Sequence, residues 1–326
     1  MHIFKNIEII DFCLFLTKSK TLVIPDVHIG YEEALNKQGI LIPRTQFKEI
    51  MINIEKIMKE AISKFKSINK IIILGDLKHE FGSISETEWR QTLRFLDFLS
   101  KFCSNIILIK GNHDTILGPI ARKRNLEIAD NCLIDDIFLV HGDKIPSDIP
   151  KQAEIIIIGH EHPAISLKHG PRVEKYKCFL EGNWIMENGI IGKLKKYAFI
   201  GTDINFRMSN SVPICRKHTN ISDKVSCVCD IERTKQFKYV NLVRSPYVDF
   251  NKKDTNIKVH HYKKQRTYNL IVMPSFNPLI EGTDILKEEL LSPLLKDADI
   301  KNFEVFIVGD NVYKFGKLKE IVKHMK

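Results

Sequence analysis

The chain has 326 residues, of which 44% are hydrophobic and 28% are charged, and its formal net charge is +10. Such a chain can bury one large core with an appendage, or two domains. Its longest apolar runs, such as 155–158, have the length of strands, which excludes a membrane-spanning helix. The apolar N-terminal run is interrupted by Glu8 and Asp11 and lacks a small-residue cleavage site, so we expect no signal peptide.

Seven cysteines are present, and most of them stand singly in apolar runs. An odd number of isolated cysteines favours buried, reduced thiols over a disulfide framework. This usage predicts a reducing, cytoplasmic location.

The first part of the chain alternates apolar runs that are typical of strands with longer segments that are typical of helices. We expect a strand over 20–25, a helix over 44–66, a strand over 71–74, a helix near 86–102 and a strand over 106–109. In the first of these helices, apolar residues recur at steps of three and four, which predicts one buried face. The alternation predicts a sheet with parallel neighbours and helices on its faces, with polar groups gathered where the strands end.

After residue 119 the elements become shorter. Strands are expected over 138–140, 155–158, 175–181, 269–273 and 303–308, followed by a final helix. Short strands separated by turns indicate a second sheet packed on the first. The polar stretch 185–268 has weak periodicity, and we interpret it as an insertion of unknown fold. The predicted core therefore comprises 1–184 and 269–326.

Five polar clusters follow apolar runs, and together they offer seven metal donors: Asp26, His28, Asp76, Asn112, His141, His160 and His162. The donors are carboxylates, an amide and imidazoles, without thiolate, a mixture that suits Mn, Fe or Zn. Any one cluster taken alone is explained better by a cap or a turn at a strand end than by a metal. The ordered set of five predicts a two-metal site.

Asp76 is the expected bridge between the two ions, because a carboxylate has one oxygen for each of them. Asp26, His28 and His162 would complete the first ion, and Asn112, His141 and His160 would complete the second. Two such ions lower the pKa of a shared water and stabilise charge on phosphoryl oxygens. The chemistry that the clusters indicate is hydrolysis of a phosphoester.

Four neighbouring residues are candidates for other roles. His113 is not needed as a ligand, so we expect a general acid or a cation that stabilises the transition state. Asp114 accepts a hydrogen bond from His113, caps a helix over 115–124, or does both. His79 contacts a phosphate or a group near the metals, or it is structural. Lys78 contacts a phosphate or is simply solvated.

Most of the net charge lies in one part of the chain. Residues 201–268 contain 14 Lys or Arg and 6 Asp or Glu. This excess indicates either a polyanionic substrate or a solvated, lysine-rich insertion. Aromatic residues stand among the basic ones, which suits stacking on single-stranded nucleic acid or a small core of the insertion's own.

The insertion also contains four donors that could bind a structural zinc ion: Cys215, His218, Cys227 and Cys229. Their spacing does not match a common zinc module, and reduced, unpaired thiols are the alternative interpretation.

The ordered set Asp-x-His, Gly-Asp, Gly-Asn-His-Asp, His-Gly and Gly-His-x-His resembles that of the calcineurin-like metallophosphoesterases. Three longer segments, 75–82, 158–163 and 273–280, resemble the archaeal SbcD-related phosphoesterases, which are similar to the phosphoesterases associated with bacterial DNA ligases. The resemblance covers about 1–184 and 269–326 and does not extend to the insertion. His79 stands where the family more usually has an aspartate.

The resemblance implies an α/β fold, a four-layer α/β/β/α sandwich of two mixed sheets with a dinuclear metal site at the C-terminal ends of strands. It also implies the ligand assignments above and a phosphodiesterase with two divalent ions, preferably Mn, with Fe, Zn, Ni or Co as alternatives. We therefore expect a cytoplasmic, metal-dependent phosphodiesterase that acts on nucleic acid and not at a membrane. The alternatives are a small-molecule or nucleotide phosphodiesterase or phosphomonoesterase on the same site, and a metal-free scaffold that binds a partner.

Overall fold

The computed structural model describes residues 1–82, 84–186, 266–296 and 298–324, together with the backbone of 215–221, 224–229 and 238–243. The chain divides into two compact units. One comprises 1–186 and 266–326, and the other comprises 187–265.

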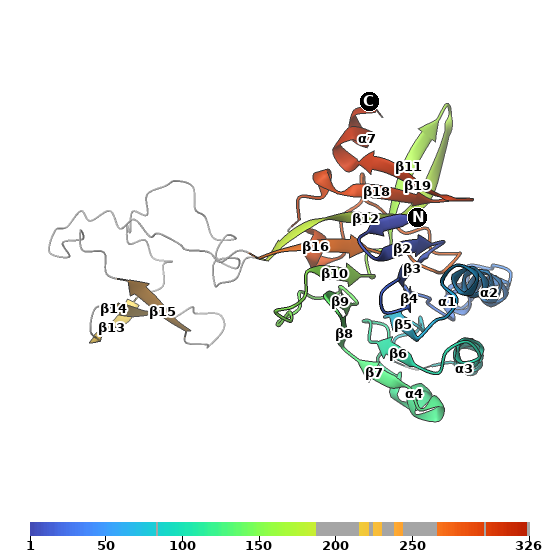
Figure 1. Ribbon diagram of the computed structural model, residues 1–326, viewed down its shortest axis with the longest axis horizontal. Helices are drawn as coiled ribbons and strands as arrows, with labels where there is room; N and C mark the ends of the chain where they lie inside the picture. Colours follow the sequence, from blue (N-terminus) through green and yellow to red (C-terminus); the bar gives the residue numbers. More distant parts are fainter. Residues whose placement is uncertain are drawn as a thin grey trace. The chain divides into compact units, whose positions relative to one another are not determined.

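The first sheet of the larger unit has seven strands in chain order (Figure 1). They are β1 (His2–Phe4), β2 (Ile7–Ile10), β3 (Cys13–Leu16), β4 (Thr21–Ile24), β5 (Lys70–Leu74), β6 (Ile106–Ile109) and β7 (Glu127–Ala129). Neighbours from β1 to β4 are antiparallel, and those from β4 to β7 are parallel.

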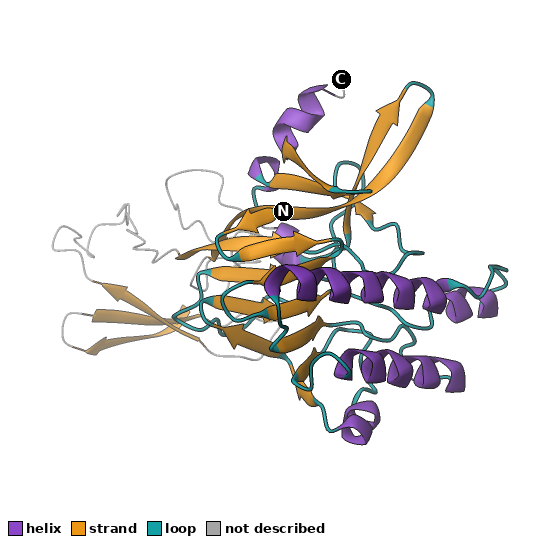
Figure 2. Ribbon diagram, turned by 45° about the vertical axis from the view of Figure 1, so that its right-hand side comes forward, coloured by secondary structure: helices purple, strands orange, loops and turns teal. Residues whose placement is uncertain are grey.

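Helices cover one face of this sheet (Figure 2), whereas the alternation of strands and helices predicts helices on its faces; the second sheet covers the other face. The helices are α1 (Tyr31–Lys37), α2 (Gln46–Phe65), α3 (Glu86–Ser100) and α4 (Gly118–Arg124). In α2 the apolar residues Ile50, Ile54 and Ile57 are completely buried against the sheet. The start of α3 is fixed by Ser85, whose hydroxyl accepts a hydrogen bond from the Glu88 amide at 3.1 Å.

The second sheet has nine strands, in the order β17-β11-β12-β16-β10-β9-β8, with β18 on β12 and β19 on β18. Their bounds are β8 (Asn131–Ile134), β9 (Ile137–Val140), β10 (Ile155–Ile158), β11 (Pro163–His169), β12 (Arg172–Met186), β16 (Arg266–Val272), β17 (Thr283–Asp284), β18 (Glu304–Val308) and β19 (Val312–Lys317). The central strands β9, β10 and β16 are parallel, and β8, β12 and β18 join the sheet antiparallel to their neighbours.

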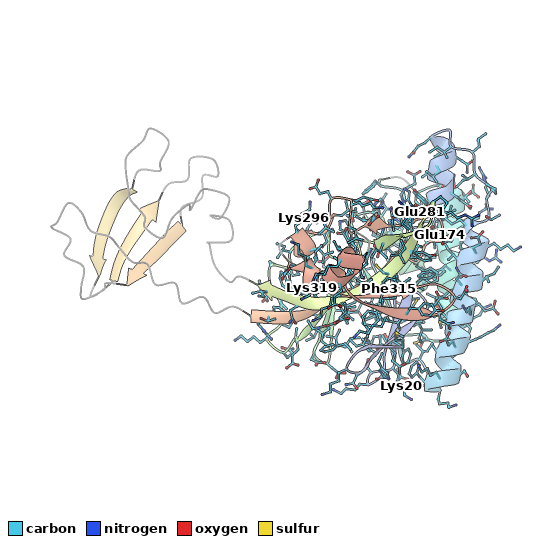
Figure 3. All side chains as sticks on the ribbon, turned by 90° about the horizontal axis from the view of Figure 1, so that it is seen from above. Lys20, Glu174, Glu281, Lys296, Phe315 and Lys319 are labelled. Carbon is cyan, nitrogen blue, oxygen red and sulfur yellow. The ribbon has the colours of Figure 1, made fainter. Side chains whose placement is uncertain are left out.

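The two sheets pack face to face. Val23, Ile72 and Ile107 of the first sheet share one buried cluster with Leu139 and Ile157 of the second. The outer face of the second sheet is covered by short helices, α6 (Pro293–Lys296), η1 (Ile300–Asn302) and α7 (Leu318–His324). This arrangement is the predicted four-layer α/β/β/α sandwich. Charged side chains such as Lys296 and Lys319 lie on its surface (Figure 3).

Several elements differ from those predicted. The strand predicted over 175–181 is part of the longer β12, and the strand predicted over 269–273 is part of β16. β12 and β16 are antiparallel neighbours, with Leu180 opposite Val272 at one end of the pairing and Met186 opposite Arg266 at the other. The hairpins β1 to β3 and the strand β19 were not predicted. The smaller unit contains a three-stranded antiparallel sheet of β13 (Cys215–Ile221), β14 (Lys224–Cys229) and β15 (Lys238–Val243). Among the described residues, no helix combines the length and apolarity that a membrane crossing requires.

Candidate metal centre

The proposed ligands all follow parallel strands. Asp26 and His28 follow β4, Asp76 follows β5, Asn112 follows β6, His141 follows β9, and His160 and His162 follow β10. Because parallel strands end at the same edge of a sheet, donors that lie far apart in the sequence come together there. The two sheets thus deliver their donors to one site.

The structure brings these donors into two groups. The potential ligand atoms of Asp26, His28 and His162 all lie within 4.8 Å of one another, as do those of Asp76, His141 and His160. Asp76 lies between the groups, because its Oδ2 is 3.3 Å from His141 Nε2 and 3.6 Å from His28 Nε2. Asn112 Oδ1 lies 3.0 Å from His141 Nε2 and so adjoins the second group.

Two ring nitrogens in the first group, His28 Nε2 and His162 Nε2, are buried and make no well-formed hydrogen bond to any described residue. Each instead faces a carboxylate oxygen: His28 Nε2 lies 3.6 Å from Asp76 Oδ2, and His162 Nε2 lies 3.2 Å from Asp26 Oδ1. A buried polar atom without a partner costs about 1–3 kcal/mol, and a bound cation would satisfy both atoms. The donor set and these two nitrogens therefore fit two divalent ions.

Four of the proposed ligands have a left-handed backbone: His28 (φ 46°), Asp76 (φ 46°), His160 (φ 61°) and His162 (φ 49°). Residues other than glycine rarely adopt this conformation, which costs about 1–3 kcal/mol each and is concentrated at functional sites. Hydrogen bonds hold the turns in place: the Asp76 carbonyl accepts from the amides of Val27 (3.1 Å) and His28 (2.9 Å).

Two glycines make room for the carboxylates. A Cβ at Gly111 would overlap the carboxylate of Asp76, and a Cβ at Gly159 would overlap that of Asp26. The glycine in Gly-Asn-His-Asp and the one in Gly-His-x-His are thus explained by the close approach of backbone to ligand.

The charges of the site support one another. Burial tends to raise the pKa of Asp26, but the nearby rings of His162, His141 and His28 outweigh burial and hold this pKa well below its usual value. Burial tends to lower the pKa of His141, but its hydrogen bond to Asp76 and the two carboxylates raise it to about 10. Burial, assisted by neighbouring imidazoles, lowers the pKa of His28 and of His160, so without metal the positive charge is concentrated on His141 between the two carboxylates.

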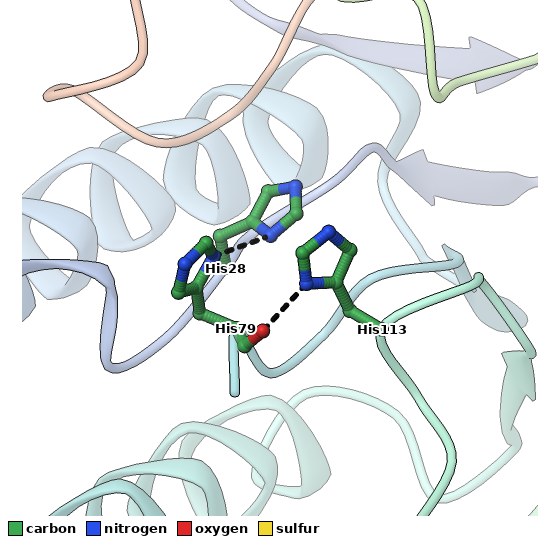
Figure 4. Close-up of side chains that lie close together, drawn as sticks. All are labelled: His28, His79 and His113. Carbon is green, nitrogen blue, oxygen red and sulfur yellow. Dashed lines mark hydrogen bonds between the residues drawn. The ribbon is translucent and has the colours of Figure 1, made fainter. Parts of the chain in front are cut away.

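His113 is held beside His28 and His79, with its ring centroid 4.9 Å from that of His28 (Figure 4). Its Nδ1 lies 2.5 Å from the carbonyl oxygen of His79, so Nδ1 carries the hydrogen of that bond. Its backbone amide donates to Asp76 Oδ1 at 2.8 Å, and its Nε2 lies 4.0 Å from Asp76 Oδ2. The ring of Phe81, which is 55% exposed, covers the His113 ring at a centroid distance of 3.8 Å.

His79 contacts the centre through His28. The Nδ1 atoms of the two rings are 3.3 Å apart, and the ring of Tyr31 packs edge-on against His79. Burial, assisted by the neighbouring His113, lowers the pKa of His79 to about 4, so its ring is neutral at pH 7. Of the roles expected for His79, the contact with a group near the metals is the one for which the structure provides a partner.

The expectations for Asp114 and Lys78 are wrong. The Asp114 carboxylate accepts from the backbone amides of Gly111 (3.1 Å), Leu77 (3.3 Å) and Lys78 (3.4 Å). It therefore fixes the turn, whereas the His113 ring donates to a carbonyl, and α4 begins only at Gly118. Burial, together with the charge of Asp76, raises the pKa of Asp114 to about 7.

Lys78 is neither solvated nor placed to meet a phosphate. Its side chain is completely buried, and its ammonium group donates to the backbone carbonyls of Glu80 and His113, the latter at 2.6 Å. Lys78 thus ties the segment that carries His79 to the segment that carries His113.

Two polar residues that support the centre were missed. Asn277 Nδ2 donates to the carbonyls of Val27 (2.9 Å) and His28 (3.1 Å), and Ser275 Oγ donates to the carbonyl of Asp26 (3.3 Å). Both residues follow β16, the parallel neighbour of β10. Their position after a strand in the core was the signal that could have identified them.

The proposed zinc donors lie outside the side chains that the structure describes. The backbone register pairs Cys215 with Cys229 and His218 with Cys227. A zinc ion at these residues stays a prediction. The four cysteines in the described part of the larger unit, Cys13, Cys103, Cys132 and Cys178, are free thiols.

Comparisons with known proteins bear on the family. Among solved structures, a single mutant of Vps29 from Entamoeba histolytica is 14% identical, with 69% of this chain and 99% of that chain covered, at a TM-score of 0.22. YfcE, a phosphoesterase from E. coli, is 17% identical, with 47% and 75% covered, at a TM-score of 0.26. At these TM-scores neither likeness carries weight. No curated protein matches the chain.

The family model for the calcineurin-like phosphoesterases matches residues 19–186, just over half of the chain. This range contains all seven proposed ligands and His113. The chain therefore belongs to the calcineurin-like phosphoesterase family.

Proposed function

We propose that the protein is a two-metal-dependent phosphodiesterase that hydrolyses the phosphodiester bonds of nucleic acid. The observation that carries the proposal is the arrangement around Asp76. Two groups of donors flank this carboxylate, and His113 lies beside it with Nδ1 already engaged and Nε2 directed to the centre.

Asp26, His28 and His162 would hold one ion, Asn112, His141 and His160 would hold the other, and Asp76 would be shared. When bound, two divalent cations supply the positive charge that acidifies a water molecule and stabilises phosphoryl oxygens. The oxygen and imidazole donors suit Mn, Fe or Zn, and we propose Mn as the preferred metal because the resemblance to the SbcD-related phosphoesterases implies it.

His113 supplies the proton for the leaving group. Its Nδ1–H donates to the His79 carbonyl, so Nε2 is the atom that carries a proton to the leaving oxygen. The alcohol released from a nucleic-acid diester is a poor leaving group and gains most from this proton. Phe81 and Lys78 keep the ring in place, the first by covering it and the second by binding the His113 carbonyl.

A nucleic-acid substrate is supported by the charge of the chain. Residues 201–268 hold 14 basic and 6 acidic residues, and polyanions are attracted by such an excess. A specific kinship with the archaeal SbcD-related phosphoesterases and a cytoplasmic location belong to the same proposal.

The test is a hydrolysis screen of the Mn-loaded protein on small diesters, a phosphomonoester, and single- and double-stranded DNA and RNA, with His113→Ala as the matched control. We expect hydrolysis of nucleic acid that His113→Ala lowers by about 10²–10⁴-fold, and binding that weakens steeply with salt. Hydrolysis confined to small esters would overturn the nucleic-acid substrate. A protein that binds no metal would overturn the enzyme and favour a scaffold.

A further inference from the structure

A groove opens beside the first group of donors. Its volume is about 420 Å³, and it is lined by Tyr31, His162, Lys175 and the loop 279–283. Sites for small ligands usually have about 300–1,000 Å³. The groove is therefore large enough for one small organic group next to the proposed metal position.

The loop 279–283 is fixed to the ligands at both ends. Before the loop, Asn277 Nδ2 donates to the carbonyl of His28 at 3.1 Å. At its end, the Thr283 amide donates to the carbonyl of His162 at 2.9 Å. Gly282 (φ 93°) passes so close to that carbonyl that a Cβ would overlap it. The loop thus forms a fixed wall at the ion that Asp26, His28 and His162 would hold.

The chemical character of the groove indicates what enters it. Tyr31 contributes an aromatic ring, and Leu279, which is 37% exposed, contributes an aliphatic surface. Among the described residues that line the groove, Lys175 is the one lysine or arginine, and its ammonium group is already 2.9 Å from the carboxylate of Glu288. Glu281 adds a negative charge. Such a lining disfavours a second phosphate.

A neutral group with a flat ring and hydrogen-bond donors fits this lining. A nucleoside has both: its base stacks on aromatic side chains, and its hydroxyl and amino groups donate to a carboxylate. We propose that the groove is a nucleoside subsite, which takes the single nucleoside attached to the scissile phosphate, with Tyr31 and Glu281 as the residues that select it. This inference rests on the proposed function.

Two diesters with the same leaving group test the subsite. Thymidine 5′-(p-nitrophenyl phosphate) carries a nucleoside where methyl p-nitrophenyl phosphate carries a methyl group. The ratio of their kcat/KM values therefore reports the contribution of the nucleoside alone. We expect a ratio of about 10 or more, which Tyr31→Ala lowers about tenfold and Glu281→Gln lowers about threefold, on the scale of one stacking contact and one hydrogen bond.

Glu289→Gln is the matched control, because Glu289 is 90% exposed, pairs with Lys296 and does not line the groove. Leu279→Asp is a second groove variant at an exposed position, so its effect does not depend on the fold tolerating the loss of Tyr31. Calorimetric titration with thymidine provides a readout without turnover, and we expect binding that the groove variants weaken and the control does not.

The outcomes separate the two proposals. If neither diester is hydrolysed by the metal-loaded protein, the proposed function fails, while thymidine binding still tests the groove. If both are hydrolysed with a ratio near one, or if the groove variants lower both rates equally, the nucleoside subsite is overturned and the phosphodiesterase stands.

Discussion

The first sheet is antiparallel from β1 to β4 and parallel from β4 to β7, and in the second the parallel strands β9, β10 and β16 lie between the antiparallel neighbours β8 and β12. The parallel and antiparallel parts differ in what their strands carry. The parallel strands β4, β5, β6, β9 and β10 all end in proposed ligands, and β16 ends in the residues that brace them. The antiparallel strands β1 to β3, β8, β18 and β19 carry none of the proposed ligands.

The difference follows from strand direction. Parallel strands bring all their carboxyl ends to one edge, whereas antiparallel strands send alternate ends to opposite edges. A site that collects seven side chains from distant parts of the chain can be built at the first kind of edge and not at the second. Substitutions at parallel strand ends should therefore have large effects on function, and matched substitutions in the flanks should have small ones.

The largest effect is expected for Asp76→Asn. The bridging carboxylate loses its charge, so the protein should lose most of its metal and nearly all of its turnover. Metal analysis and hydrolysis of bis(p-nitrophenyl) phosphate measure the two losses. Asp135→Asn, in the turn between the antiparallel β8 and β9, is the control and should leave both unchanged. Two bound metals and a near-normal rate in Asp76→Asn would refute the bridge.

Adding a methyl group to Gly159, which follows β10, is expected to weaken metal binding nearly as much as the loss of the Asp76 charge does. Gly159→Ala would place a Cβ against the Asp26 carboxylate, whereas the Cβ of Gly118→Ala would meet Arg122 Nη1 at an ordinary 3.4 Å. We expect the first variant to bind metal at least tenfold more weakly and the second to behave as the wild type. Metal titration followed by calorimetry compares them, and equal affinities would show that the close approach is not required.

His113→Ala should retain both metals and lose about 10²–10⁴-fold in kcat, the usual scale for a positioned acid. The loss should shrink for diesters whose leaving group is already acidic, because such a group needs no proton. A series of aryl and alkyl diesters measures this dependence. Loss of metal together with activity would instead make His113 a ligand.

The contrast between the two parts of the sheets also explains what could be predicted from sequence. The parallel strands are apolar runs that end in polar clusters, so the strands and their donors were both identified. The flanking strands β1, β2 and β3 are about as short as β4 and β6, but no cluster of metal donors follows them in the sequence, so nothing marked where they end. Lys78 was misjudged because one of its two carbonyl partners, that of His113, lies 35 residues away, and nothing in the local sequence indicates that contact.

Lys177 of β12 is expected to affect the stability of the protein, not its catalysis. Its ammonium group donates to the carbonyls of Ser275 (3.1 Å) and Asn277 in the segment that braces the Asp26–His28 turn. Burial lowers the pKa of Lys177 to about 7, against the smaller opposing influence of Asp11. Between about pH 7 and the ordinary value of 10.5, the unfolded chain therefore binds more protons, and stability should increase with pH.

Lys177→Met removes this dependence. Relative to wild type, the variant should become less stable as the pH rises from 7 to 10, by an amount on the order of 1 kcal/mol or more. Urea unfolding of the metal-free proteins at several pH values measures the difference. Lys59→Met, at an exposed position of α2, should show no such trend. A difference that is independent of pH would mean that Lys177 stays charged throughout the range.

The smallest effect on the catalytic edge is expected from the largest change to the chain, removal of 187–265. The segment joins β12 to β16, and Met186 pairs with Arg266, so a two-residue Asn-Gly turn can close the hairpin. The cost of closing a loop changes only slowly with its length, and no proposed ligand of the two-metal centre is lost. Hydrolysis of bis(p-nitrophenyl) phosphate should therefore stay within about twofold of wild type, because the residues that the turn would join, Met186 of β12 and Arg266 of β16, are not among the proposed ligands.

Binding of single-stranded DNA should respond differently, because excision removes most of the basic residues of 201–268. We expect weaker binding and a shallower dependence of affinity on salt, since fewer phosphates are neutralised. Urea unfolding establishes whether the shortened protein is folded. If it is folded and its DNA affinity is unchanged, the charge excess is a solvated surface and nucleic acid is bound elsewhere. If it is unfolded, the segment is needed for the stability of the core, even though it contributes no proposed ligand to the two-metal centre.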